Sequence, residues 1–190
     1  MLFKKLAKGE FKALVQMILE TTEVIGPRQV GVNAHGKPMH RFDTVGSFEE
    51  IDLQYETTQF SAKTCFMPFK EELSKFTLQE KDWAQEITYW NEPRAVIGLH
   101  ACDIHGLLKL DKVFTREFFP NPYYLARRNN TFIVGIDHEP CEGGFCRALV
   151  TDTVTQGFDL FLTDLGDRYF VAVGSDRGYN ALQRVQVEEI

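Results

Sequence analysis

The stretch RAVIGLHACDIHGLLKLD, from Arg94 to Asp111, decides the fold, and FIVGIDHEPCEGGFC, from Phe132 to Cys146, repeats its pattern. Each begins with a short apolar run typical of a buried strand and reaches a cysteine soon after that run ends. In an open α/β sheet, ligands bind beyond the carboxyl ends of the strands. If the two strands are neighbours, Cys102, Cys141 and Cys146 meet at one edge of the sheet. The two stretches therefore predict an α/β fold with a metal site at the carboxyl ends of its strands.

The spacing of the donor residues indicates four metal ligands arranged in two pairs, Cys102-x2-His105 and Cys141-x4-Cys146. A set of three cysteines and one histidine fits a tetrahedral zinc ion. The same donors fit an iron–sulfur cluster, because thiolates are its usual ligands and histidine replaces cysteine in some clusters. The spacing alone does not distinguish the two metals.

Two other roles remain open for these cysteines. Cys102 and Cys146 can be small buried residues beside chain turns, since a free cysteine packs well in a core. A cysteine can also act as a nucleophile with His100 or His105 as its base, although the sequence offers no third residue to orient that base.

The remaining hydrophobic pattern predicts a mixed sheet flanked by helices, with two β-hairpins. Trp83, Ile87 and Trp90 have helical spacing, and Pro68 is typical of the first turn of a helix. Asp103 is expected to cap the helix that follows the strand ending at Leu99. The expected helices are 9–23, 70–76, 78–90, one from 103 onward, one ending at 127–128, and 179–184, and the hairpins pair 30–32 with 39–45 and 158–163 with 168–173.

Composition and charge limit the classes of protein to which the chain can belong. A formal net charge of −6 gives no basic surface for nucleic acid. No apolar run approaches the roughly 18–20 residues of a membrane span. Four cysteines without an export signal are more typical of metal ligands than of disulfides, which predicts a cytoplasmic protein. With no internal repeat or linker, residues 1–190 are expected to form one domain.

Five segments, taken in order, resemble a known family. The order resembles the amino-terminal region of the iron–sulfur β subunits of cytoplasmic sulfhydrogenases and of the related iron–sulfur subunits of anaerobic sulfite reductases, over roughly residues 60–175. The segments are KTCFMPFKEEL (63–73), RAVIGLHACDIHGLLKLDKVF (94–114), YYLARRNNTFIVGI (123–136), CEGGFC (141–146) and GFDLFLTDLGDRYFV (157–171).

The resemblance implies an electron-transfer accessory subunit that binds a [4Fe-4S] cluster in an anaerobic oxidoreductase complex. Its implied partners are a catalytic subunit and a flavin-carrying or ferredoxin-type subunit, with no role for nucleic acid or membrane. Cys102, Cys141 and Cys146 match the family's cysteines, whereas Gly144 stands where the family has a further cysteine. The family pattern also continues into a ferredoxin-like part with two cysteine-rich motifs, which these 190 residues do not contain.

The missing cysteine leaves the fourth cluster ligand open. We expect His105, because it follows Cys102 by about one helical turn. Cys65, Asp103 and an exogenous ligand are the alternatives. The alternative function is a zinc-stabilised Cys3His scaffold that assembles such a complex without carrying electrons. The aromatic stretch FFPNPYY, from Phe118 to Tyr124, with Arg127 and Arg128, is expected to cover the cluster or to contact a partner.

Overall fold

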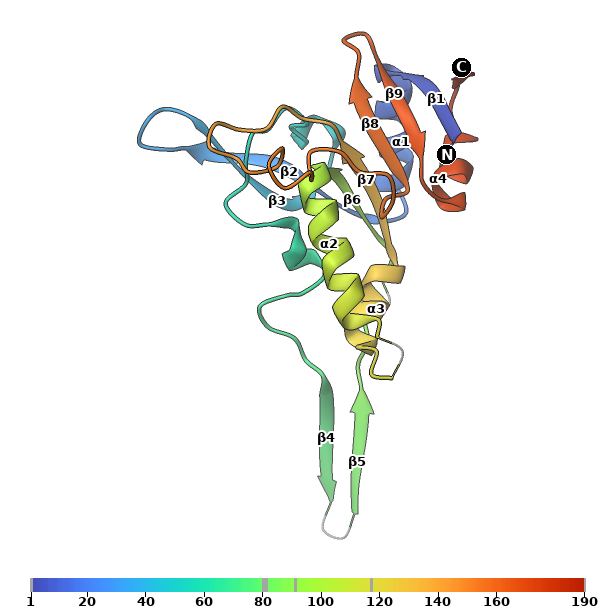
Figure 1. Cartoon of the computed structure of the whole chain (residues 1–190). Helices are drawn as coiled ribbons and strands as arrows, with labels where there is room; N and C mark the ends of the chain where they lie inside the picture. The colour runs from blue at the N-terminus through green and yellow to red at the C-terminus, as the bar shows by residue number, and fades with distance from the viewer. Residues whose placement is uncertain (1, 80–81, 91, 117, 190) are drawn as a thin grey trace.

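An eight-stranded mixed sheet, in the order β10-β1-β9-β8-β7-β6-β2-β3, forms the centre of the molecule (Figure 1). The computed structural model describes residues 2–79, 82–90, 92–116 and 118–189. Strands β2, β6, β7 and β8 run parallel, and antiparallel strands flank them on both sides. The strands of this sheet are β1 (Leu2–Ala7), β2 (Glu23–Val32), β3 (Pro38–Val45), β6 (Arg94–Leu99), β7 (Thr131–Ile136), β8 (Leu160–Asp164), β9 (Arg168–Val173) and β10 (Glu188–Glu189).

Helices cover both faces of this sheet. In the described residues these are α1 (Lys8–Leu19), α2 (Ala101–Phe114), α3 (Pro122–Asn129) and α4 (Asp176–Leu182). Apolar side chains of α1 and α4 pack in one core cluster, and those of α2 and α3 pack in a second. Alternate residues of β7 divide between the two, with Val134 in the first cluster and Ile133 in the second. The predicted α/β fold, a mixed sheet flanked by helices, is confirmed.

A bulge at Gly98 directs the chain from β6 to α2. The register of β6 with β7 shifts between Ile97 and Leu99, and Gly98 has a φ of 86°. Because side chains alternate along a strand, Ile97 and Leu99 would otherwise face the same side. The bulge places them in different clusters, with Leu99 on the face that α2 covers. His100 is then the residue that precedes α2, so the helix begins before Asp103, the predicted cap.

The segment predicted to form helices at 70–76 and 78–90 is a hairpin instead. Strand β4 (Ser74–Gln79) pairs with β5 (Asp82–Ile87) in a separate two-stranded sheet that projects from the molecule (Figure 1). We call β4 and β5 the arm. The helical prediction is wrong, because Trp83 contacts Phe76 across the two strands and not a helical neighbour. Residues 80, 81 and 91 of the predicted segments lie outside the described residues.

The other predicted elements are present. The helix at 9–23 is α1, the helix ending at 127–128 is α3, and the closing helix is α4, although it begins three residues earlier than predicted. Both predicted hairpins form, as β2–β3 and β8–β9. Within the described residues, no helix is long and apolar enough to cross a membrane.

Candidate metal centre

A group of three potential metal ligands lies beside the first turn of α2. Cys102 is the second residue of that helix, and His138 and Cys146 belong to the loop that joins β7 to β8. Their ligand atoms all lie within 4.8 Å of one another. Figure 1 shows this loop passing over the end of α2. Two thiols and an imidazole are donors that zinc and iron–sulfur clusters both accept.

A column of three stacked rings stands next to these donors. The rings of His138 and His100 lie 3.7 Å apart at 2° to each other, and those of His100 and Tyr55 lie 4.1 Å apart at 5°. The Tyr55 hydroxyl donates a hydrogen bond of 2.8 Å to the carbonyl oxygen of Gly98. The column therefore connects the loop after β7, the residue after β6 and the bulge within β6.

Both histidines of the column are neutral near pH 7. Burial lowers the pKa of His100 to about 3, and burial also lowers the pKa of His138. Nε2 of His100 and Nδ1 of His138 are buried and have no hydrogen-bond partner in the described part of the chain. Such atoms are uncommon in folded proteins and call for a specific explanation.

The thiol of Cys102 is protonated when no cation is present. Burial and the nearby charges of Asp103 and Cys146 raise the pKa of Cys102 to about 12. A metal ion reverses this effect, because a coordinated thiol loses its proton. Burial also raises the pKa of Asp103, while Ser61 donates a hydrogen bond of 3.3 Å to Oδ1 of this carboxyl.

The structure brings two of the predicted ligands together. Cys102 and Cys146 are in the group, whereas Cys141 and His105 are not members of it. Cys141 lies in the same loop as Cys146, and its carbonyl oxygen accepts a hydrogen bond of 2.9 Å from the Gly144 N–H. A Cβ atom at Gly144 would lie only 3.1 Å from Sγ of Cys141, so the small residue at this position leaves room for that thiol.

His105 and Cys65, two candidates for the fourth ligand, have contacts elsewhere. Nε2 of His105 lies 2.8 Å from the carbonyl oxygen of Thr153, which ties α2 to the β7–β8 loop. Cys65 is buried in the core cluster beneath α2. Sequence reasoning passed over His138, although His138-x2-Cys141 repeats the spacing of Cys102-x2-His105.

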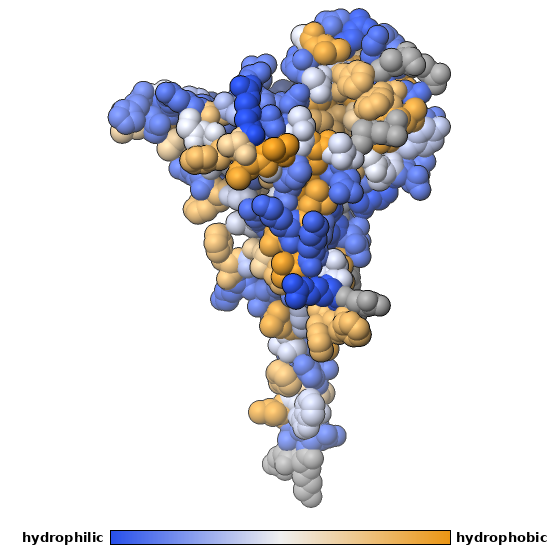
Figure 2. All heavy atoms as spheres, viewed as in Figure 1, coloured by the Kyte–Doolittle hydropathy of each residue, from blue (hydrophilic) through white to orange (hydrophobic). Residues whose placement is uncertain are grey.

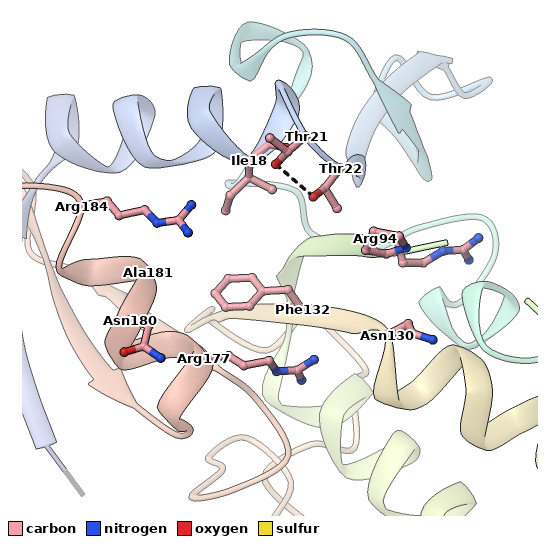
Figure 3. A pocket seen from close by; sticks show the side chains of 11 residues that line it. Ile18, Thr21, Thr22, Arg94, Asn130, Phe132, Arg177, Asn180, Ala181 and Arg184 are labelled. Atoms are coloured by element: carbon pink, nitrogen blue, oxygen red, sulfur yellow. Dashed lines mark hydrogen bonds between the residues drawn. The ribbon is translucent and has the colours of Figure 1, made fainter. Parts of the chain in front are cut away.

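A cavity of about 390 Å³ lies at the opposite edge of the sheet, where β6 and β7 begin. Phe132 projects into it between Ile18 and Ala181 (Figure 3). Arg177 also lines it, but this guanidinium is bound to the Asp159 carboxylate and to backbone carbonyl oxygens. No thiol or imidazole is among the lining residues, so the cavity is separate from the group of metal ligands.

Comparison with known proteins finds a clear relationship to a hydrogenase subunit, and no family model matches the chain. The chain is 35% identical over 179 residues to a protein of Pyrococcus furiosus described as sulfhydrogenase 2 subunit beta. The match covers 94% of this chain and 50% of that protein, so the chain spans about half the length of its relative.

Proposed function

We propose, from its confirmed resemblance to the β subunit of a sulfhydrogenase, that this chain is an electron-transfer component of a hydrogenase-type complex. The observation that carries the proposal is the meeting of Cys102, His138 and Cys146 beside α2. In this proposal the chain holds a [4Fe-4S] cluster, with Cys141 completing the set of cysteines. Such a cluster accepts and donates single electrons, and substrate chemistry takes place on another subunit.

The surroundings of the three donors suit a redox centre. Cys102 and His138 are partly buried, and the stacked rings cover one side of the imidazole. Burial, ligand type and hydrogen bonds to sulfur set the potential of an iron–sulfur cluster. The chain's contribution is therefore to fix the ligands and to limit the access of water, which tunes the potential without changing the cluster.

The spacing of the donors supports a second candidate, a structural zinc site. With Zn–S bonds of about 2.3 Å, two thiolates in a tetrahedron lie about 3.8 Å apart. Ligand atoms that all lie within 4.8 Å of one another can surround a single ion of this kind. In this alternative the metal fastens the β7–β8 loop to α2 and helps to assemble a complex.

Metal analysis separates the two candidates. We expect protein purified under anaerobic conditions to contain iron and acid-labile sulfide, with a broad absorption band near about 400 nm from thiolate-bound clusters. Cys102→Ser is expected to lose this band, because a ligand is removed. Zinc in a colourless sample would support the structural site, and iron retained in full by the serine variant would exclude Cys102 as a ligand.

The partners of the chain, we propose, are other subunits of the same complex, which contact the arm and the exposed phenylalanines after α2. The arm carries exposed apolar side chains on both strands, among them Phe76, Leu78 and Trp83. Phe118 and Phe119 are more than four-fifths exposed. Figure 2 shows apolar residues along the arm and around its base. Large exposed apolar surfaces of this kind mark interaction sites.

Arg127 and Arg128, predicted to contribute to the same surface, have partners within the chain. Arg127 is buried, donates a hydrogen bond of 3.2 Å to the Phe66 carbonyl oxygen and pairs with Glu71. Arg128 forms an ion pair of 3.1 Å with Asp111. Both arginines stabilise the base of the arm and α3, which leaves the aromatic residues as the proposed contact surface.

A further inference from the structure

The imidazole of His138 has the position of a metal ligand. It follows β7 by two residues, and its ligand atom lies within 4.8 Å of the Sγ atoms of Cys102 and Cys146. The three donors come from two segments that are distant in sequence, the first turn of α2 and the β7–β8 loop. A single centre bound by all three would hold these segments together.

The plane of the His138 ring is fixed before any metal binds. His100 covers one face of the ring, and Tyr55 supports His100 from the other side of the column. The backbone N–H of His138 also donates a hydrogen bond of 3.0 Å to Oδ1 of Asp137. A ligand already held in place loses little freedom on binding, which favours metal affinity.

The nitrogen atoms of His138 are free to bind a metal. Nδ1 is buried and has no hydrogen-bond partner among the described residues. Because a buried polar atom is normally paired, the absence of a protein partner points to a bound group. Neutral imidazole is a common ligand of zinc and iron.

His105 has a different role in this geometry. Its Nε2 lies 2.8 Å from the carbonyl oxygen of Thr153, which can only accept a hydrogen bond. Nε2 therefore carries the proton and donates it, and this contact directs the ring toward residues 151–155 of the loop. The contact holds the loop against α2 without placing His105 among the grouped donors.

We infer that His138 supplies the nitrogen ligand of the metal centre, beside Cys102, Cys146 and Cys141, and that His105 does not bind the metal. This inference rests on the proposed metal centre and applies to either metal. With an iron–sulfur cluster, one imidazole in place of a thiolate removes a negative charge and raises the reduction potential. With zinc, the site is of the Cys3His type.

The test compares the wild type with His138→Ala, His138→Cys and, as a matched control, His105→Ala, all purified without oxygen. We expect metal content to fall at least two-fold in His138→Ala and to remain at the wild-type level in His105→Ala. His138→Cys is expected to keep its metal, because a thiolate can replace the imidazole, and this variant also guards against loss of the fold. Circular dichroism checks that each variant is folded.

A spectroscopic measurement identifies the ligand directly. In protein labelled with ¹⁵N-histidine and reduced, pulsed electron paramagnetic resonance is expected to show a nitrogen coupled to the cluster in the wild type and in His105→Ala. The coupling should be absent in His138→Cys. Full metal content in His138→Ala, or a coupling that persists in His138→Cys, would overturn the inference. Zinc without iron in the wild type would contradict the electron-transfer proposal alone, because the metal contents of the variants still test His138.

Discussion

At the scale of single residues, Cys65 shows what a cysteine does when it is not a ligand. Its side chain packs in the core cluster that includes Phe66 and Leu99. Burial raises the pKa of the Cys65 thiol to about 11. The thiolate, which is the reactive form, is therefore scarce at neutral pH, and the thiol is shielded as well.

We predict that Cys65 resists alkylation by iodoacetamide at pH 8 in the native protein and reacts once the protein is unfolded in urea. Peptide mass spectrometry measures both. Cys65→Ala should keep the wild-type metal content, while costing about 1 kcal/mol of stability for the lost packing. Rapid native alkylation, or loss of metal in this variant, would assign Cys65 to the metal centre instead.

The raised pKa of Cys65 also predicts how stability changes with pH. The unfolded chain releases this proton near the ordinary pKa of 9.0, whereas the folded chain holds it until about 11. Stability from this thiol is therefore complete below pH 9 and declines as pH rises from 9 to 11, by at most about 1.4 kcal/mol per pH unit. Urea unfolding at pH 8 and pH 10 should show a larger decline for the wild type than for Cys65→Ala. An equal decline would show that Cys65 is not linked to it.

The sequence predicted the cysteines of the site better than its histidine. Cys102 and Cys146 follow apolar strands, and strand ends are recognisable from hydrophobic runs. The position of His138 depends on stacking with His100, which follows a different strand, and on Tyr55, which lies far away in the sequence. Spacing alone gives no indication of such contacts, so His105 and His138 were equivalent as sequence candidates.

At the scale of elements, the parallel strands and the arm differ in how readily they could be predicted. Strands β6 and β7 are buried on both faces and appear as continuous apolar runs. The arm buries neither face in the sheet, so neither side of β5 requires an alternating pattern. Trp83 and Ile87 are four residues apart, which fits a helix as well as it fits one edge of a strand.

The bulge of β6 gives a prediction at the same scale. Gly98 has a φ of 86°, and a Cβ atom there would lie 3.0 Å from Leu53 and 3.1 Å from Pro27. Gly36 has a φ of 76° and no atom within 4 Å of such a Cβ, so it provides the matched control. Gly36→Ala should cost about 1–2 kcal/mol from backbone strain alone.

Gly98→Ala should cost about 1–3 kcal/mol more than Gly36→Ala, because the added methyl group also crowds a packed core. Urea unfolding of the two variants measures the difference. Equal costs would mean that Leu53 and Pro27 move aside easily and that the bulge is not tightly packed.

At the scale of the whole molecule, the metal centre and the arm lie far apart along α2. The grouped donors adjoin the first turn of this helix, and the arm lies beyond its other end (Figure 1). A two-stranded hairpin is only marginally stable in water by itself. An arm with this many exposed apolar side chains is therefore expected to be covered by a partner subunit in the assembled complex.

The arm gives the last prediction. Replacing both Phe76 and Trp83 with serine should weaken co-purification of the other subunits at least ten-fold, because aromatic side chains at an interface often contribute about 1–2 kcal/mol each. Metal content and melting temperature should stay close to those of the wild type, since neither residue belongs to a core cluster of the large sheet. Val32→Ser, on an exposed side chain of the β2–β3 hairpin, is the control and should leave assembly intact. If the double variant assembles normally but no longer forms dimers of this chain, the arm is a contact between two copies and not a subunit interface.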